Sequence, residues 1–339
     1  MKKILYCIVL VVFCLLANAC ATDDPVTQDD QVITDTEDPD DDADTTTDTY
    51  ELIAVTDLGD IVAIGNNTGE LRRIDQVNDV NTLGSMGNIA SSEAAIYYLD
   101  RYYDPGPITE LIVYDRLAQT QDRRVLNFPP TITGNDIGIV HLFWSQDQLI
   151  AFIAPDVLTG QPPIFYIATI DPVSYEMADT GVSVEASVIT SVLQLDDTLY
   201  ISSWDQTLSR VNLTTGLSQE VVSSTTPLYG SRMAQISAHQ IAMLQSEPGF
   251  IGGGKPVIVD IETGAVNFSD DPTVYGMVSI FGATKYDAPS NTYFNLVGLY
   301  ETDSYLEILK VNTNTGSQTT TRVNTTSISR NIIIIDIER

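Results

Sequence analysis

Val211-Asn212-Leu213-Thr214-Thr215-Gly216 is the stretch of this 339-residue chain that decides the expected fold, because variants of it return five times. Each copy ends a run of apolar β-formers. The Asp or Asn that follows can accept hydrogen bonds from its own downstream backbone, and a terminal Gly can take positive φ. A second strand follows every time, so each copy predicts the turn of a β-hairpin. The other copies span residues 64–69, 113–118, 170–175, 259–264 and 311–316.

The spacing of the copies indicates the architecture. Counted from their second residues, they lie at positions 65, 114, 171, 212, 260 and 312, with gaps of 49, 57, 41, 48 and 52 residues. A period of about 50 residues, with several short strands in each unit, is typical of a β-propeller. In the fourth unit we expect four strands, at 190–195, 198–204, 207–212 and 217–223. Six unrelated hairpins in a β-sandwich are the alternative.

The two ends of the folded part predict how the ring closes. The first unit has only three expected strands, at 51–56, 61–64 and 71–74, whereas the run 330–336 follows a sixth complete unit and has no partners. This run is apolar and β-branched, as suits a strand buried on both faces. We therefore expect an all-β, six-bladed propeller over 50–339, closed by the C-terminal strand as the innermost strand of the first blade. A seventh, degenerate blade near 78–94 is the alternative.

Residues 1–19 have the features of a lipoprotein signal peptide. Lys2 and Lys3 are positively charged, and the apolar run 4–16 is too short to span a bilayer. The sequence Ala17-Asn18-Ala19-Cys20 resembles the bacterial lipobox, although the family usually has Leu where Ala17 stands. The resemblance implies that Cys20 becomes the lipidated, palmitate-bearing first residue of the mature protein. An ordinary secretory signal cleaved nearby is the alternative.

Residues 20–49 are expected to form a disordered tether behind the lipidated cysteine. The stretch 21–49 holds twelve acidic residues and no Lys or Arg, so like-charge repulsion keeps it extended. Asp23 and Asp24 resemble the export signal of surface lipoproteins in Bacteroidota-type bacteria, and Asp44-Thr45-Thr46 resembles the O-glycosylation motif of that group. These resemblances imply an outer-membrane or cell-surface protein that is held to the membrane by its lipid anchor.

Charge and cysteine content exclude several chemistries. The net charge of -30 at pH 7 divides into +2 for the signal, -12 for the tether and -20 for the rest. A domain of this sign repels nucleic acid and anionic membrane surfaces, so we expect neither as its partner. All three cysteines (Cys7, Cys14 and Cys20) lie at or before the expected cleavage point, so the folded part has no disulfide, thiolate metal site or cysteine nucleophile.

The loops between the second and third strands of the blades form the expected ligand-binding face. They are longer than the motif turns and rich in aromatic and acidic residues, and loops on a rigid scaffold concentrate binding residues. The innermost strands begin on the same face, which adds arginines near the channel mouth. Alternatively, long loops tolerate drift and their aromatic residues merely cover the blade ends. The predicted ligand-binding residues are Arg101, Tyr102, Tyr103, Asp104, Asp156, Trp204, Phe250, Tyr300, Asp303, Tyr305, Arg232 and Arg330.

Over 50–339 the architecture and turn pattern resemble six-bladed propellers of the broad NHL/YVTN type. No active-site motif takes part in the resemblance, so it implies no catalytic residues. We expect a binding or scaffolding module that captures a glycan, a peptide or an envelope protein partner, with no cofactor required. A purely structural envelope lipoprotein is one alternative.

A Ca²⁺-dependent hydrolase or lactonase in the channel mouth is the other alternative. Asn135, Asp136 and Asn331 are suitable oxygen ligands for such an ion, although no spacing makes them specific. The only histidines, His141 and His239, are expected toward the motif-turn face and read as structural residues. The sequence contains no G-x-S-x-G or H-E-x-x-H motif, so an enzyme is the less favoured interpretation.

Overall fold

A computed structural model of the chain is all-β. The chain divides after Thr45, and every described residue belongs to the second unit, Thr46–Arg339. These described residues contain no helix that is long and apolar enough to cross a membrane. The structure describes residues 49–80, 88–102, 108–134, 137–155, 164–186, 189–203, 208–222, 233–246, 253–268, 275–277, 284–298, 306–324 and 332–339.

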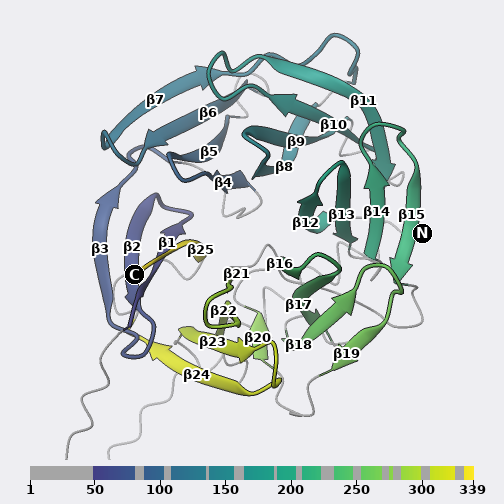
Figure 1. The fold of residues 1–339 in the computed structure, drawn as a ribbon. Coiled ribbons are helices and arrows are strands. Elements are labelled where there is room, and N and C mark those ends of the chain that lie inside the picture. Colours follow the sequence, from purple (N-terminus) through teal and green to yellow (C-terminus); the bar gives the residue numbers. More distant parts are fainter. Residues whose placement is uncertain are drawn as a thin grey trace, which may run out of the picture. The chain divides into compact units, whose positions relative to one another are not determined.

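The strands form six antiparallel, four-stranded blades arranged in a ring (Figure 1). Each blade runs from an inner strand beside the axis to an outer strand at the rim. The blades are β25 (Ile332–Glu338), β1 (Glu51–Thr56), β2 (Asp60–Gly65) and β3 (Leu71–Gln76); β4 (Ile89–Ser91), β5 (Ala95–Tyr102), β6 (Ile108–Asp115) and β7 (Thr120–Val125); β8 (Gly138–Ser145), β9 (Gln148–Ala154), β10 (Ile164–Ile170) and β11 (Met177–Glu185); β12 (Ile189–Leu195), β13 (Thr198–Ser203), β14 (Leu208–Asn212) and β15 (Ser218–Val222); β16 (Ala234–Ser237), β17 (Gln240–Ser246), β18 (Gly253–Asp260) and β19 (Val266–Phe268); and β21 (Thr284–Asp287), β22 (Thr292–Gly298), β23 (Leu306–Asn312) and β24 (Gln318–Val323).

The C-terminal strand closes the ring, as the sequence predicts. β25 pairs with β1 in antiparallel register, with Val55 opposite Ile333 and Glu51 opposite Glu338. Its residues 332–335 are four isoleucines, each at most 4 % exposed, and they join the core shared by the first, second and sixth blades. The alternative of a seventh blade near 78–94 is wrong, because β4 in this region is the inner strand of the second blade.

One strand was not expected. β20 (Tyr275–Met277) lies between the fifth and sixth blades and pairs with both β18 and β22. The two blades are therefore joined into one nine-stranded sheet by backbone hydrogen bonds. Apolar clusters also lie between neighbouring blades. A backbone hydrogen bond from the N–H of Asn324 to the carbonyl of Gly69, at 3.1 Å, joins the sixth blade to the first.

The recurrent motif is a turn between the third and fourth strands of every blade. In the fourth blade the Oδ1 atom of Asn212 accepts hydrogen bonds from the backbone N–H groups of Thr214 and Thr215, and the N–H of Gly216 donates to the carbonyl of Asn212 at 2.8 Å. In all six turns the residue four positions after the Asx position (Gly65 in the first copy and Asp115 in the second) has positive φ, which is the left-handed conformation the motif requires. These residues are Gly69, Gln119, Tyr175, Gly216, Gly264 and Gly316.

The weakest copy is displaced by one residue from the sequence interpretation. Asp115, and not Tyr114, supplies the carboxylate that accepts the turn hydrogen bonds, from the N–H groups of Leu117 and Ala118. Tyr114 instead lies in β6 and donates from its hydroxyl to Asp75 of β3, which links the second blade to the first. The sequence did not reveal the correct alignment of this copy with the motif, because the positive-φ position holds Gln119 and not glycine.

The first copy of the motif, at 64–69, has no side-chain acceptor at the Asx position. Gly65 stands where the other turns have Asp or Asn, and Asn66 beside it accepts from the N–H of Thr49 at 3.1 Å, which fixes the entry of the chain into β1. Gly69 in this turn lies against the sixth blade: an added Cβ would come within 1.8 Å of the carbonyl oxygen of Arg322. The turn thus packs the closing blade directly against its neighbour.

Burial follows the position of each strand in its blade. β1 and β2 are almost continuously buried because neighbouring blades cover both of their faces. The outer strands β3 and β7 are mostly exposed and carry arginine and other polar residues. Polar, charged outer strands discourage pairing with other chains at the rim.

Candidate functional site

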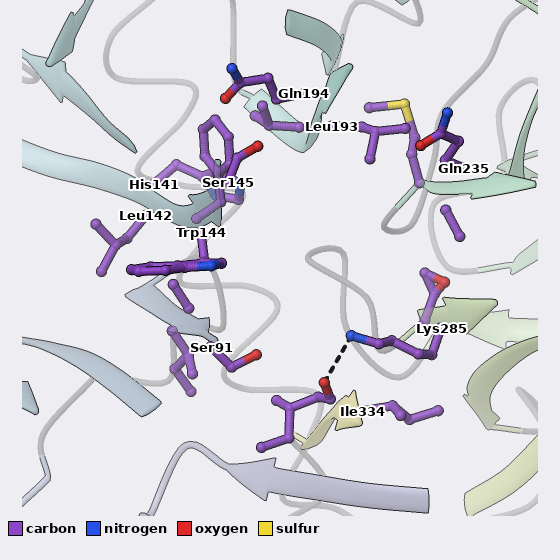
Figure 2. A pocket seen from close by; sticks show the side chains of 18 of the residues that line it. Ser91, His141, Leu142, Trp144, Ser145, Leu193, Gln194, Gln235, Lys285 and Ile334 are labelled. Carbon is purple, nitrogen blue, oxygen red and sulfur yellow. Dashed lines mark hydrogen bonds between the residues drawn. The ribbon is translucent and has the colours of Figure 1, made fainter. Parts of the chain in front are cut away.

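The inner strands of all six blades contribute to one cavity on the axis of the propeller (Figure 2). Its volume is about 340 Å³, and its described lining comes from β4, β8, β12, β16, β21 and β25. The lining lies toward the C-terminal end of β8 and β12, but toward the N-terminal end of β16 and β21.

Lys285 supplies the one formal positive charge in the described lining of the cavity. It lies in β21, is half-buried, and donates from Nζ to the carbonyl oxygen of Ile335 in β25 at 2.9 Å. Figure 2 shows its side chain extending toward the open centre. No aspartate or glutamate occurs among the described lining residues, although acidic residues outnumber basic ones by 46 to 16 in the chain. The described part of the lining therefore differs in charge from the protein as a whole.

The aromatic side chain of Trp144 also lines the cavity. Trp144 of β8 stacks on Tyr97 of β5 with ring centroids 5.5 Å apart and planes 8° from parallel, which fixes the indole across the boundary between two blades. In Figure 2 the nitrogen-bearing end of the indole points toward the open centre, on the other side from Lys285. Stacking of this kind favours one orientation of the indole beside the cavity.

Neutral polar side chains complete the lining. Ser91, Ser145, Gln194 and Gln235 come from four different blades. Gln194 donates from Nε2 to the carbonyl of Asp196 at 2.8 Å, while its buried Oε1 atom accepts no hydrogen bond from the described residues. A ligand that donates a hydrogen bond to such a buried acceptor is stabilised by that bond.

The two histidines have different surroundings. His141 lies in the inner strand β8, as expected, and is only 4 % exposed; its ring contacts those of Phe143 and Phe152, with centroids 6.4 and 6.3 Å away. It also lines the cavity. His239 lies in the turn after β16 and forms an exposed pair with Glu262, Nδ1 to Oε1 3.0 Å, within the motif turn of the fifth blade.

The motif acids act within their own turns. The backbone N–H groups of Ser174 and Val173 donate to Asp171 and lower the pKa of that carboxyl. The hydroxyl of Thr263, followed by its backbone N–H, lowers the pKa of Asp260 in the same way. Both carboxylates are stabilised by local hydrogen bonds, which accounts for the recurrence of this residue type without any ligand.

The sequence-predicted binding face remains a prediction. The long loops do connect second to third strands, since they lie between β5 and β6, β9 and β10, β13 and β14, β17 and β18, and β22 and β23. Arg101 and Tyr102 belong to the backbone of β5, and their side chains are outside the description. The other predicted residues lie outside the described residues: Tyr103, Asp104, Asp156, Trp204, Phe250, Tyr300, Asp303, Tyr305, Arg232 and Arg330, together with Cys20.

The proposed Ca²⁺ ligands Asn135, Asp136 and Asn331 also lie outside the described residues, directly before β8 and β25. Within the part of the chain that is described, no group of three or more His, Cys, Asp or Glu side chains could hold a metal ion. The described cavity offers one ammonium, one imidazole, hydroxyls and amides, which suit hydrogen bonding and charge recognition.

Sequence reasoning did not select Lys285, Trp144, Gln194 or Gln235. The inner strands could be located, but which of their alternating side chains face the axis depends on the register and twist of each blade. Lys285 itself could have indicated the site, because it lies in the inner strand of the sixth unit and the chain has only 16 basic residues.

The fold and its axial cavity define a six-bladed β-propeller, and solved structures support this class. A putative 6-phosphogluconolactonase from Bacteroides uniformis ATCC 8492 matches with a TM-score of 0.50 and 12% sequence identity, over 83% of this chain and 85% of that one. A second putative 6-phosphogluconolactonase, from Bacteroides fragilis NCTC 9343, matches with a TM-score of 0.50 and 11% identity, over 83% and 98% of the two chains. At such identities the likeness concerns the fold alone.

The sequence comparisons give no family. No protein-family model matches the chain, and none of the curated proteins matches it.

Proposed function

We propose that this protein is a lipid-anchored binding module of the outer membrane or cell surface, whose propeller captures a glycan, a peptide or a protein partner. The observation that carries the proposal is the axial cavity, because all six blades contribute to it. Its volume of about 340 Å³ is near the lower end of the usual range for small-molecule sites, about 300 to 1,000 Å³. A cavity of this size suits one sugar unit or one side chain of a larger ligand.

The construction of the cavity supports recognition. Each inner strand pairs antiparallel with the second strand of its blade, so most of the lining side chains are positioned by strands and not by loops. Aromatic, amide, hydroxyl and ammonium groups converge on the space from separate blades. Such a mixture fixes the orientation of a polar ligand, while the apolar groups around it exclude water.

A hydrolase or lactonase acting in the channel mouth is the second candidate. His141 and Lys285 in the cavity are the observations that favour it, since both residue types serve as general acids and bases. A calcium ion held by Asn135, Asp136 and Asn331 would supply Lewis-acid polarisation of a carbonyl in that mechanism. A structural envelope lipoprotein is the third candidate and requires no ligand.

Thermal unfolding of the full-length protein in detergent separates these functions. A ligand that binds only the folded state raises the melting temperature by mass action, so a panel of glycans and peptides is tested in EDTA and in Ca²⁺. A rise with a glycan or peptide in EDTA supports the binding module. A large rise with Ca²⁺ alone, followed by turnover of lactone substrates, would transfer the proposal to the hydrolase. No rise under any condition contradicts small-ligand binding.

The anchor requires its own test. Cys20→Ala is expected to move the protein from the membrane fraction to the soluble fraction, because the variant lacks the thiol that carries the lipid. Cys14→Ala is the matched control and is expected to remain in the membrane fraction. Membrane fractionation of Cys20→Ala would show that the lipoprotein interpretation is wrong.

A further inference from the structure

We propose that the axial cavity binds one uncharged sugar ring of a glycan, through hydrogen bonds from side chains of three different blades. This inference rests on the proposed binding function and narrows its ligand to one chemical class. It starts from four side chains of the cavity lining whose polar atoms have no hydrogen-bond partner among the described residues. They are Ser91, Trp144, Ser145 and Gln235.

The four side chains converge on one space. Ser91 belongs to β4, Trp144 and Ser145 to β8, and Gln235 to β16. The first three are half-buried and Gln235 is exposed, so the cavity gives a ligand access to them. Figure 2 shows the nitrogen-bearing end of the Trp144 indole toward the open centre and Gln235 on the other side of it. A molecule at the centre therefore meets hydrogen-bonding groups on opposite sides.

The donor and acceptor types of these groups match sugar hydroxyls. The indole N–H of Trp144 only donates, whereas a serine hydroxyl and the Gln235 amide both donate and accept. A sugar hydroxyl also donates and accepts, so it can pair with any of them. A carboxylate only accepts and an ammonium only donates, and each loses strongly bound water when it enters a partly apolar space. An uncharged ring that carries hydroxyls therefore satisfies these groups at the lowest desolvation cost.

The shape of the cavity favours a ring over an extended peptide. A sugar ring directs its hydroxyls outward in several directions, as groups from three blades around an axis require, whereas the polar groups of a peptide backbone follow one line. Apolar side chains also occur in the lining, among them Leu142, Leu193 and Met233, and they suit the C–H groups of the ring. The volume of about 340 Å³ is sufficient for one such ring.

Lys285 and His141, which also line the cavity, are engaged in contacts of their own. The ammonium of Lys285 donates to the carbonyl of Ile335 at 2.9 Å, and the ring of His141 packs beside Phe143 and Phe152. The proposed hydrogen bonds to the sugar come from the four neutral side chains alone.

The test is a titration of the full-length protein in a zwitterionic detergent that carries no sugar, measured by thermal unfolding and by tryptophan fluorescence. The probes are the methyl glycosides of D-glucose, D-galactose and D-mannose. We expect at least one of them to bind saturably at millimolar concentration. For the sugar that binds, the corresponding uronate and 2-amino-2-deoxy glycosides place a charge on the same ring. Both should bind about tenfold more weakly, because a charged group costs more to desolvate.

Three variants locate the site. Gln235→Met removes the amide at similar side-chain length and should lower the affinity about three- to tenfold, the equivalent of one lost hydrogen bond. Trp144→Phe removes the indole N–H and should abolish the fluorescence change that accompanies binding. Gln148→Met is the matched control, because Gln148 lies in β9 and outside the cavity lining, and it should leave the affinity unchanged.

The Gln235 variant keeps the test decisive if the tryptophan variant does not fold. Trp144→Phe alters the stacking on Tyr97, which joins two blades. Gln235→Met breaks no side-chain hydrogen bond with the part of the chain that the structure describes, so it should fold and melt like the wild type without ligand.

The outcomes separate the sugar ring from the broader binding function. The sugar-ring inference is overturned if none of the three glycosides binds, if a charged analogue binds more tightly, or if Gln235→Met and the wild type have equal affinity. A fluorescence change that persists in Trp144→Phe also overturns it, because the sugar then binds elsewhere. If the glycosides fail but a peptide stabilises the wild type and not Gln235→Met, the binding function stands and only the ligand class is wrong. If glycosides and peptides all fail, small-ligand binding itself is contradicted.

Discussion

Truncation of one closing-strand side chain tests whether β25 holds the ring together. Ile333 is fully buried opposite Val55, so Ile333→Ala removes apolar contacts at the seam between the two ends of the chain. Ile→Ala at a buried position costs about 2 to 5 kcal/mol. A domain of about 290 residues has an unfolding entropy near 0.6 kcal/mol/K at its midpoint, so the melting temperature should fall by roughly 3 to 8 °C.

Ile164→Ala is the matched control, because Ile164 is also a strand isoleucine but is 40% exposed in β10. It should change the unfolding free energy by less than about 1 kcal/mol. Both variants are measured by circular dichroism during heating. Equal shifts for the two variants would mean that burial in the closing strand does not govern stability.

Deletion of residues 332–339 extends the test from one side chain to the whole strand. The variant leaves β1 with an open edge, so cooperative unfolding should be lost or its midpoint should fall far below that of Ile333→Ala. A synthetic peptide of residues 330–339, added in excess, should restore part of the stability by occupying that edge. A truncated protein that melts like the wild type would refute closure by β25.

Three further changes probe other contacts of the ring. Burial alone would raise the pKa of Asp287, but hydrogen bonds from Ser290 and Arg339 and the Arg339 charge outweigh it and lower the pKa below its usual value. The ionised carboxylate therefore stabilises the fold above about pH 4, and this stability is lost as the pH falls through the lowered pKa. Asp287→Asn should lower the free energy of unfolding at pH 7 by about 1 to 3 kcal/mol, measured by urea titration. The difference from the wild type should shrink as the pH is lowered toward about 3. Tyr114→Phe removes the hydroxyl that donates to Asp75 across the first two blades and should cost about 1 to 2 kcal/mol, measured by urea unfolding; no loss would show that this bond is not formed in solution. Gly69→Ala should lower the melting temperature by several degrees, because φ is +65° and the added Cβ would meet the backbone of Arg322 in β24. Gly316→Ala has the same sign of φ but open space around the added Cβ, so it should lower the melting temperature less.

Local chemistry explains why most of the fold could be predicted from the sequence. The motif turn depends on one Asx acceptor and one positive-φ residue within five positions, so each copy reveals a hairpin without knowledge of its surroundings. The bounds of β1 were predicted to the residue, and the predicted closing strand 330–336 overlaps the observed Ile332–Glu338. Counting strands at the two ends was enough to pair them.

What could not be predicted depends on contacts between blades. β20 forms because two neighbouring blades each offer it a free strand edge, and its short segment has no apolar alternation of its own. The stacking of Trp144 on Tyr97, and the approach of Lys285 to Ile335, each join residues of different blades whose facing depends on the completed ring. The long-loop residues predicted to bind ligand remain a hypothesis for direct test.

The pairing of β25 with β1 also has a consequence for the order of events during synthesis. Every other blade is made from one continuous stretch of chain and can assemble soon after it leaves the ribosome. The first blade cannot, since its inner strand β25 follows all the other described strands in the chain. β1, β2 and β3 must wait with one unpaired edge until β25 has been translated, and the pairing of longest sequence separation then forms last. Such a delay keeps the ring open until β25 has left the ribosome.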